Sequence, residues 1–169
     1  MKNLVLIGLS GCGKSTLGRR LSKALRMPLL DTDAMVEEAA GCTVADIFAR
    51  HGEARFRELE SEACRKAAAQ QGAVIATGGG MVLREENMEA LASGGVIFFI
   101  DRHPSHILRS ARLGDRPLVA DDTRKLYRLY AERLALYRRW ADAVIPSRGS
   151  SRRIARTFRH ILRRFKKAA

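Results

Sequence analysis

Nine residues near the amino terminus, GLSGCGKST from Gly8 to Thr16, could hold a phosphate group. Two glycines five residues apart are followed directly by Lys14 and Ser15, the spacing of a phosphate-binding loop, or P-loop. In such a loop glycine lets backbone N–H groups turn toward phosphate oxygens, the lysine reaches the β- and γ-phosphates, and the hydroxyl binds Mg²⁺. The apolar run Leu4–Ile7 and a helical pattern flank the loop. The sequence therefore predicts a nucleotide site between a strand and a helix.

Two carboxylates, Asp31 and Asp33, follow the apolar pair Leu29-Leu30. Open α/β sheets bind ligands beyond the carboxyl ends of their strands. One carboxylate could help to hold Mg²⁺ while the other accepts a hydrogen bond from an attacking hydroxyl. Alternatively, the segment forms a turn in which Asp33 caps a helix over Ala34–Ala39. The spacing leaves both interpretations open.

Three consecutive glycines, Gly78, Gly79 and Gly80, follow Thr77 at the end of the apolar run Ala73–Ala76. Such a turn exposes backbone N–H groups and lets a ligand approach the chain closely. A turn without a ligand is the alternative. We expect a ligand-binding turn at the same edge of the sheet.

The elements that must position these residues alternate along the chain. Apolar runs of strand length occur at Leu4–Ile7, Leu29-Leu30, Ala73–Ala76, Val96–Ile100 and Ala143–Ile145. Helical patterns cover Lys14–Arg26, Thr43–Arg50, Ala54–Gln70, Arg84–Ala92, Pro104–Arg112, Arg124–Ala141 and Ile154–Lys167. The alternation predicts an α/β fold of three layers, with a central parallel sheet of about five strands flanked by helices. Two stretches without clear periodicity, 113–123 and 146–153, are predicted to be loops.

Composition sets broad limits on the protein. Its 169 residues, 46% of them hydrophobic, suit a single domain over 1–169. No apolar run approaches the roughly 18–20 residues of a membrane span, and the amino terminus does not read as a signal peptide, so we expect a cytoplasmic protein. Three widely spaced cysteines predict reduced thiols without a zinc site. The net charge of +13 fits a nucleic-acid binder, an enzyme for anionic substrates, or a solvated basic face.

A P-loop alone fits a kinase, a GTPase switch, or a motor or helicase. The sequence has no Asn-Lys-x-Asp stretch to bind guanine and no Asp-x-x-Gly after a strand. It is also short for a P-loop helicase. These observations favour a small-molecule kinase.

Six stretches together resemble the shikimate kinase family: GLSGCGKSTLGRRL, LLDTD, GEARFRELE (52–60), TGGG, RPL (116–118) and YAERLALYR (130–138). They occur in the family's order and spacing over nearly the whole chain. The resemblance implies a P-loop kinase fold with a substrate-binding region at about 32–60 and a mobile lid at about 113–123. It also implies transfer of the ATP γ-phosphoryl group to the 3-hydroxyl of shikimate, in aromatic amino acid biosynthesis. Mg²⁺ is the implied cofactor, and the implied state is a monomer.

The resemblance assigns roles to individual residues. ATP would be held by Gly11, Cys12, Gly13, Lys14, Ser15, Thr16, Arg116 and one arginine of the 146–153 loop, Arg152 in preference to Arg148. Ser15 would bind Mg²⁺ directly and Asp31 through water. Shikimate would contact Asp33, Arg57, Gly78, Gly79, Gly80 and Arg133. The catalytic residues would be Asp33, Lys14 and Arg116.

Physical chemistry agrees with these roles. A planar guanidinium binds a carboxylate bidentately, and this suits Arg57 and Arg133 to an acidic substrate. Taken singly, each of these arginines reads better as surface charge. A gluconate or nucleotide kinase is the competing enzyme.

A basic ATP-dependent nucleic-acid-binding protein is the competing class. Apolar residues at Ile154, Phe158, Ile161 and Phe165 mark the buried stripe of a terminal helix with a solvated basic outer face. We therefore expect neither a nucleic acid nor a membrane as a partner.

Overall fold

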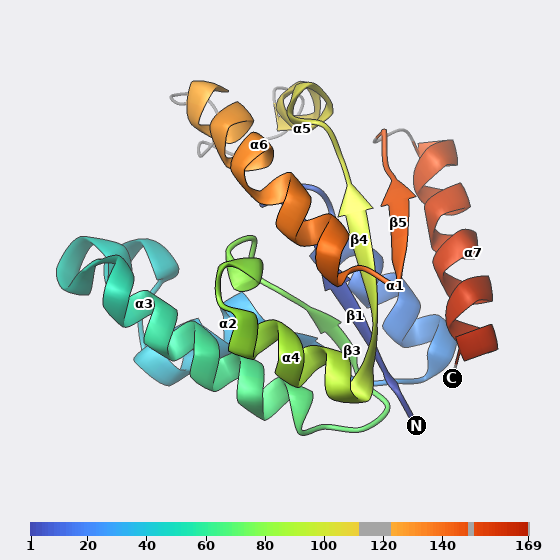
Figure 1. Ribbon diagram of the computed structural model, residues 1–169, viewed down its shortest axis with the longest axis horizontal. Coiled ribbons are helices and arrows are strands. Elements are labelled where there is room, and N and C mark those ends of the chain that lie inside the picture. Colours follow the sequence, from blue (N-terminus) through green and yellow to red (C-terminus); the bar gives the residue numbers. More distant parts are fainter. Residues whose placement is uncertain (112–122, 149–150, 169) are drawn as a thin grey trace.

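The computed structural model describes residues 1–111, 123–148 and 151–168, with side chains other than those of residues 111 and 151–155. Its centre is a parallel sheet of five strands in the order β2-β3-β1-β4-β5 (Figure 1). The strands are β1 (Asn3–Ile7), β2 (Leu29–Asp31), β3 (Val74–Ala76), β4 (Gly95–Asp101) and β5 (Ala143–Pro146). The predicted α/β architecture is confirmed.

Helices connect the strands at close to the predicted positions. They are α1 (Lys14–Leu25), α2 (Thr32–Ala40), α3 (Val44–Ala68), α4 (Glu85–Gly94), α5 (Pro104–Ala111), α6 (Thr123–Trp140) and α7 (Ser151–Ala168), with a short 3₁₀ turn η1 (Met81–Leu83). Gly52 interrupts α3 with φ 76° and ψ 177°. The sequence predicted this break, because it placed separate helical patterns on either side of Gly52.

Side chains of β1 alternate between two apolar cores, one on each face of the sheet. Leu4 and Leu6 pack in a core that includes side chains of α1 and α7. Val5 and Ile7 pack in a second core with side chains of α3, α4 and α6. All five residues of β1 are buried, which explains why its sequence is a continuous apolar run rather than an alternating one.

Asp31, not Asp33, caps α2. The Asp31 carboxylate accepts hydrogen bonds from the backbone N–H groups of Asp33 and Ala34 at 3.2 and 3.5 Å. The alternative in which Asp33 forms the cap is therefore wrong. Asp33 lies in the first turn of α2, where its side chain is free for another role.

The structure describes the two predicted loops to different extents. The predicted lid at 113–123 lies outside the described residues, except for Thr123, the first residue of α6. The predicted loop at 146–153 is shorter than expected, because Pro146 ends β5 and Ser151 begins α7. Arg152 therefore belongs to the first turn of α7 and not to a loop.

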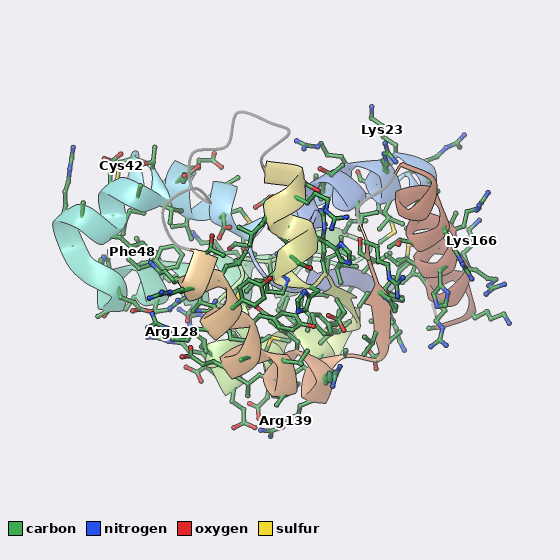
Figure 2. All side chains as sticks on the ribbon, turned by 90° about the horizontal axis from the view of Figure 1, so that it is seen from above. Lys23, Cys42, Phe48, Arg128, Arg139 and Lys166 are labelled. Carbon is green, nitrogen blue, oxygen red and sulfur yellow. The ribbon has the colours of Figure 1, made fainter. Side chains whose placement is uncertain are left out.

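Helix α7 has the predicted amphipathic character. Ile161 and Phe165 are buried in the core, whereas Arg159, Arg163 and Lys166 are exposed. Figure 2 shows Lys166 pointing away from the outer side of α7. Within the described residues, no helix is both long and apolar enough to cross a membrane.

Candidate active site

The P-loop joins β1 to α1, as the sequence predicted. Gly8, Gly11 and Gly13 have φ angles of 144°, 78° and 102°, which side chains disfavour and glycine accepts. The Lys14 ammonium is buried and donates to the carbonyl oxygens of Gly8 and Leu9 at 2.7 and 3.0 Å. In this conformation the Lys14 side chain folds back and binds the backbone of its own loop.

The other predicted nucleotide residues lie around this loop. Cys12 is buried, and a Cβ placed on Gly8 would lie 3.0 Å from its sulfur, so the thiol fills space between glycines. Ser15 and Thr16 are exposed in the first turn of α1. The amino end of α1 adds a positive dipole end to the loop.

A hydroxyl and a carboxylate meet where a metal ion would bind. Ser15 Oγ donates to Asp31 Oδ2 at 2.7 Å, joining the P-loop to the end of β2. Mg²⁺ prefers such oxygen ligands and normally uses only one or two from the protein, together with water and substrate phosphates. Ser15 and Asp31, the two residues predicted to hold the metal, therefore have oxygen atoms and a separation that suit Mg²⁺.

The Asp33 carboxyl lies beside the P-loop lysine. Burial raises its pKa to about 6; the Lys14 charge lowers it, while the neighbouring carboxylates of Asp31, Glu60 and Glu37 raise it further. A carboxylate with a pKa nearer to neutral is a stronger base than an ordinary aspartate. Asp33 thus has the environment of a general base or a hydroxyl-orienting group.

Arg57 is held by two carboxylates of its own helix. Its guanidinium bonds Glu60 at 2.7 Å and Glu53 at 3.0 Å. Burial lowers the Arg57 pKa, but the hydrogen bonds and charges of Glu60 and Glu53 outweigh it and raise the pKa. The Glu60 side chain is 1% exposed. A buried carboxylate of the same helix therefore fixes the direction of the Arg57 guanidinium.

The glycine turn after β3 lets these groups come close together. A Cβ on Gly78 would lie 2.5 Å from Asp33 Oδ1 and 2.8 Å from Glu60 Oε1. A Cβ on Gly80 would overlap the Arg57 guanidinium. A side chain at either position would therefore displace these charged groups, although neither glycine has a positive φ.

Gly79 connects the turn to the P-loop and to α6. A Cβ on Gly79 would lie 2.9 Å from the backbone nitrogen and the hydroxyl of Ser10. The Gly79 carbonyl accepts from Arg133 Nη1 at 3.1 Å and from the Tyr137 hydroxyl at 2.5 Å. Asp33, Arg57, Arg133 and the three glycines are thus brought together beside the P-loop.

Two predicted nucleotide residues stay predictions. Arg116 lies outside the described residues, and the Arg152 side chain is not described. Arg148, the alternative to Arg152, lines a cavity of about 520 Å³ together with Ile145, Pro146, Arg156, Thr157 and His160.

Sequence reasoning assigned no part in substrate binding or catalysis to Glu53, Glu60 or Tyr137. Glu53, Arg57 and Glu60 are spaced four and three residues apart, so they share one helix face. This spacing was available in the motif. Tyr137 lies four residues after Arg133, but its bond to Gly79 spans 58 residues and required the fold.

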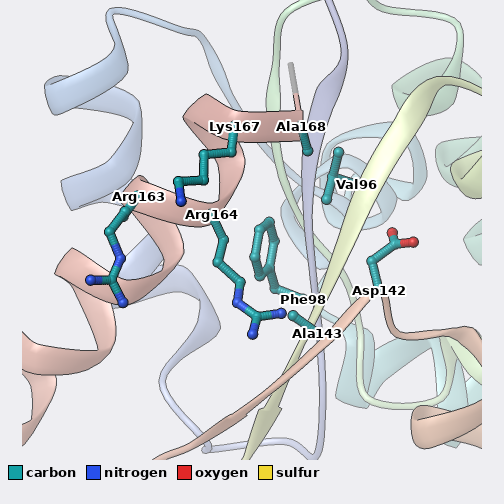
Figure 3. A pocket seen from close by; sticks show the side chains of 8 residues that line it. All are labelled: Val96, Phe98, Asp142, Ala143, Arg163, Arg164, Lys167 and Ala168. Atoms are coloured by element: carbon teal, nitrogen blue, oxygen red, sulfur yellow. The ribbon is translucent and has the colours of Figure 1, made fainter.

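A second cavity, of about 470 Å³, lies between α7 and the beginnings of β4 and β5 (Figure 3). Val96, Phe98 and Ala143 supply apolar walls, and Arg163, Arg164, Lys167, Ala168 and Asp142 complete the lining. The P-loop follows the carboxyl end of β1, at the opposite end of the parallel strands. This cavity contains none of the predicted site residues.

The fold and the site together define a small-molecule kinase of the P-loop α/β class. Comparison with known proteins is more specific: the sequence model for shikimate kinase matches residues 10–164, and the chain belongs to the shikimate kinase family. A shikimate kinase of Clostridium beijerinckii is 42% identical over 86% of both chains. That of Symbiobacterium thermophilum is 47% identical over 80% of both.

Solved structures agree with this assignment. The chain superposes on shikimate kinase from Acinetobacter baumannii in complex with shikimate with a TM-score of 0.89 and 29% identity. The match covers 99% of this chain and 94% of the other. The predicted family and fold are confirmed.

Proposed function

We propose that this chain transfers the γ-phosphoryl group of ATP to the 3-hydroxyl of shikimate, giving shikimate 3-phosphate and ADP. One observation carries the proposal: a carboxylate and two guanidinium groups meet at one glycine turn beside a P-loop. Shikimate carries a carboxylate and ring hydroxyls, which these groups complement. The family and the likeness to a structure that holds shikimate support this choice over gluconate or a nucleotide.

Asp33 acts on the reacting hydroxyl. Its carboxylate accepts the hydrogen bond of that hydroxyl and takes up the proton as phosphoryl transfer proceeds. Lys14 leaves the carbonyl oxygens of its own loop and binds the β- and γ-phosphates, where it stabilises the charge spread over the transferred group. Arg116, assigned from the family resemblance, adds a second positive charge.

Ser15 and Asp31 would hold a Mg²⁺ ion, Ser15 directly and Asp31 through water. Bound there, the ion would supply positive charge against the phosphates of ATP. The two side chains already lie within hydrogen-bond distance of each other, so the fold brings both of them to the place where the ion would bind.

Arg57 and Arg133 bind the substrate carboxylate. Glu60 and Glu53 fix the direction of the Arg57 guanidinium before substrate arrives. Such preorganisation reduces the side-chain entropy that binding would otherwise cost.

ADP release by the purified protein with Mg²⁺–ATP tests the proposal. The acceptors to compare are shikimate, gluconate, nucleoside monophosphates and none. Turnover that depends on shikimate alone is the expected result. Folded, ATP-binding protein that releases no more ADP with shikimate than without an acceptor would overturn it.

Arg57→Ala, compared with Arg55→Ala on the same helix, tests the carboxylate site. Loss of a buried charge pair with substrate should cost roughly 2–5 kcal/mol, a loss of about 30-fold to several thousand-fold in kcat/KM for shikimate. Arg55 is exposed and bonds Glu58, so its removal should leave the kinetics close to wild type. Equal kinetics for the two variants would remove Arg57 from the site.

The proposal includes an active monomer in the cytoplasm, with ATP and shikimate as its only partners. Light scattering during size-exclusion chromatography tests the monomer. A dimer mass at assay concentration would correct this part without affecting the reaction.

A further inference from the structure

Two side chains of α6 share one acceptor in the glycine turn. Arg133 and Tyr137, one helical turn apart, both donate to the Gly79 carbonyl. The shorter bond, 2.5 Å, comes from Tyr137 and the longer, 3.1 Å, from Arg133. A shared carbonyl links the arginine of the carboxylate site to a tyrosine without an assigned role.

The Tyr137 ring is fixed by packing, whereas Arg133 is only half-buried. Tyr137 is 0% exposed, and its ring stacks on Phe99 with centroids 4.9 Å apart and planes tilted by 18°. Burial raises the pKa of its hydroxyl well above the ordinary value, so the group remains a protonated donor at neutral pH. Tyr137 is therefore the permanent donor and Arg133 the movable one.

We propose that Tyr137 is a positioning residue of the acceptor site, whose hydroxyl holds the Gly79 carbonyl so that Arg133 can turn to the substrate carboxylate. The inference rests on the proposed function. When Arg133 leaves the carbonyl, Tyr137 keeps this buried acceptor paired. Without the hydroxyl, moving Arg133 would leave the acceptor unpaired, which is costly in a buried position.

The packing of Gly79 links the Tyr137 hydroxyl to the nucleotide loop. Its Cα lies against Ser10 of the P-loop, with no room for a methyl group. The peptide of Gly79 is therefore held between α6 and the nucleotide loop. By holding its carbonyl, Tyr137 sets the distance between the acceptor turn and the phosphate loop.

Tyr137→Phe in the full chain tests the inference, with Tyr130→Phe as the matched control. Tyr130 lies on the same helix and its hydroxyl donates to Asp101 Oδ1 at 2.7 Å, away from the glycine turn. In Tyr137→Phe the KM for shikimate should rise about tenfold to hundredfold. The KM for ATP should stay within about twofold of wild type, and Tyr130→Phe should retain both values.

A merely structural tyrosine would behave differently. It would lower the thermal midpoint in Tyr137→Phe and leave the shikimate KM of the folded protein unchanged, and this result would overturn the inference. Parallel increases in both KM values would also overturn it. If Tyr137→Phe does not fold, Phe99→Leu loosens the ring and keeps the hydroxyl; an unchanged shikimate KM there counts against the inference.

The wild-type assay separates this inference from the proposed function. Wild-type protein without shikimate-dependent turnover refutes the proposed function itself. Active wild-type protein with an unaltered Tyr137→Phe variant refutes only the positioning role.

Discussion

Asp33 has an environment that lowers stability and that suits the proposed chemistry. Its carboxyl is desolvated and lies near three other carboxylates, and Lys14 compensates only in part. The pKa is consequently about 6 in place of 3.8. Such a group resists ionisation in the folded protein, and the same property makes its carboxylate a better proton acceptor.

Asp33→Asn should therefore stabilise the protein at neutral pH while it abolishes turnover. The raised pKa makes folded protein bind the Asp33 proton more tightly than unfolded protein does, so this contribution to stability is present below about pH 4 and is lost as the pH rises through about 6. At about pH 8, without Mg²⁺ or nucleotide, the variant should gain about 2–3 kcal/mol in the free energy of unfolding. Urea titrations at several pH values measure this gain.

Below about pH 4 wild type and variant should unfold at similar urea concentrations, which provides the internal control. A variant less stable than wild type at about pH 8 would contradict the desolvated environment of Asp33.

At the scale of elements, a break in α3 directly precedes the proposed carboxylate site. Gly52 adopts φ 76° and ψ 177°, a region that is essentially restricted to glycine. The helix changes direction there, directly before the stretch that carries Glu53, Arg57 and Glu60. The conformation of Gly52 therefore sets the direction of the helical segment that carries these three side chains.

Gly52→Ala should cost about 1–3 kcal/mol in stability, because alanine is strained in that conformation. It should also raise the KM for shikimate more than that for ATP, since α3 supplies residues to only one of the two sites. Gly94→Ala is the control: Gly94 ends α4 without a positive φ, and its nearest neighbour is at 3.9 Å. Thermal unfolding and steady-state kinetics of both variants check this, and equal effects of the two substitutions would refute it.

How much the sequence predicts depends on how local the cause is. The P-loop, the strand Leu4–Ile7 and the break at Gly52 are readable because contiguous residues determine them. The sequence offered Asp33 as the N-cap of α2 and missed Asp31, because either aspartate can accept hydrogen bonds from N–H groups two or three residues later in the chain. Arg57 and Arg133 were assigned only through resemblance, since a single arginine on a helix carries no sign of what it faces.

The shared acceptor at Gly79 lies beyond sequence reasoning for the same reason. Its donors are far away in the chain, and only the parallel sheet and the packing of α6 bring them together. Likewise, the glycines of the turn predicted close approach to a ligand. The structure shows that they first of all admit the protein's own Asp33, Arg57 and Ser10.

For the whole molecule, the net charge of +13 is the dominant long-range effect. Exposed cations include Arg159 and Arg163 of α7, which lie one turn apart and repel each other. Self-repulsion of this kind destabilises a compact protein, and salt screens it.

The thermal midpoint should therefore rise when sodium chloride increases from about 0.01 to about 0.15 M, as the screening length falls from about 30 to about 8 Å. The double variant Arg159→Glu, Arg163→Glu should show a smaller rise, because it removes repulsion on α7. Calorimetry with sodium fluoride as a second salt separates screening from specific chloride binding. A midpoint that falls with salt in the wild-type protein would contradict the expectation.

The bonds from Lys14 to the carbonyls of its own loop have a consequence for inhibitors. A ligand with β- and γ-phosphates must displace two charge-assisted hydrogen bonds before it gains its own. Part of its binding enthalpy is thus an exchange of partners, and only a strongly anionic group can compete. A neutral compound in the adenine region would leave the lysine where it is. Phosphate-bearing and neutral inhibitors would therefore bind the P-loop in two different conformations.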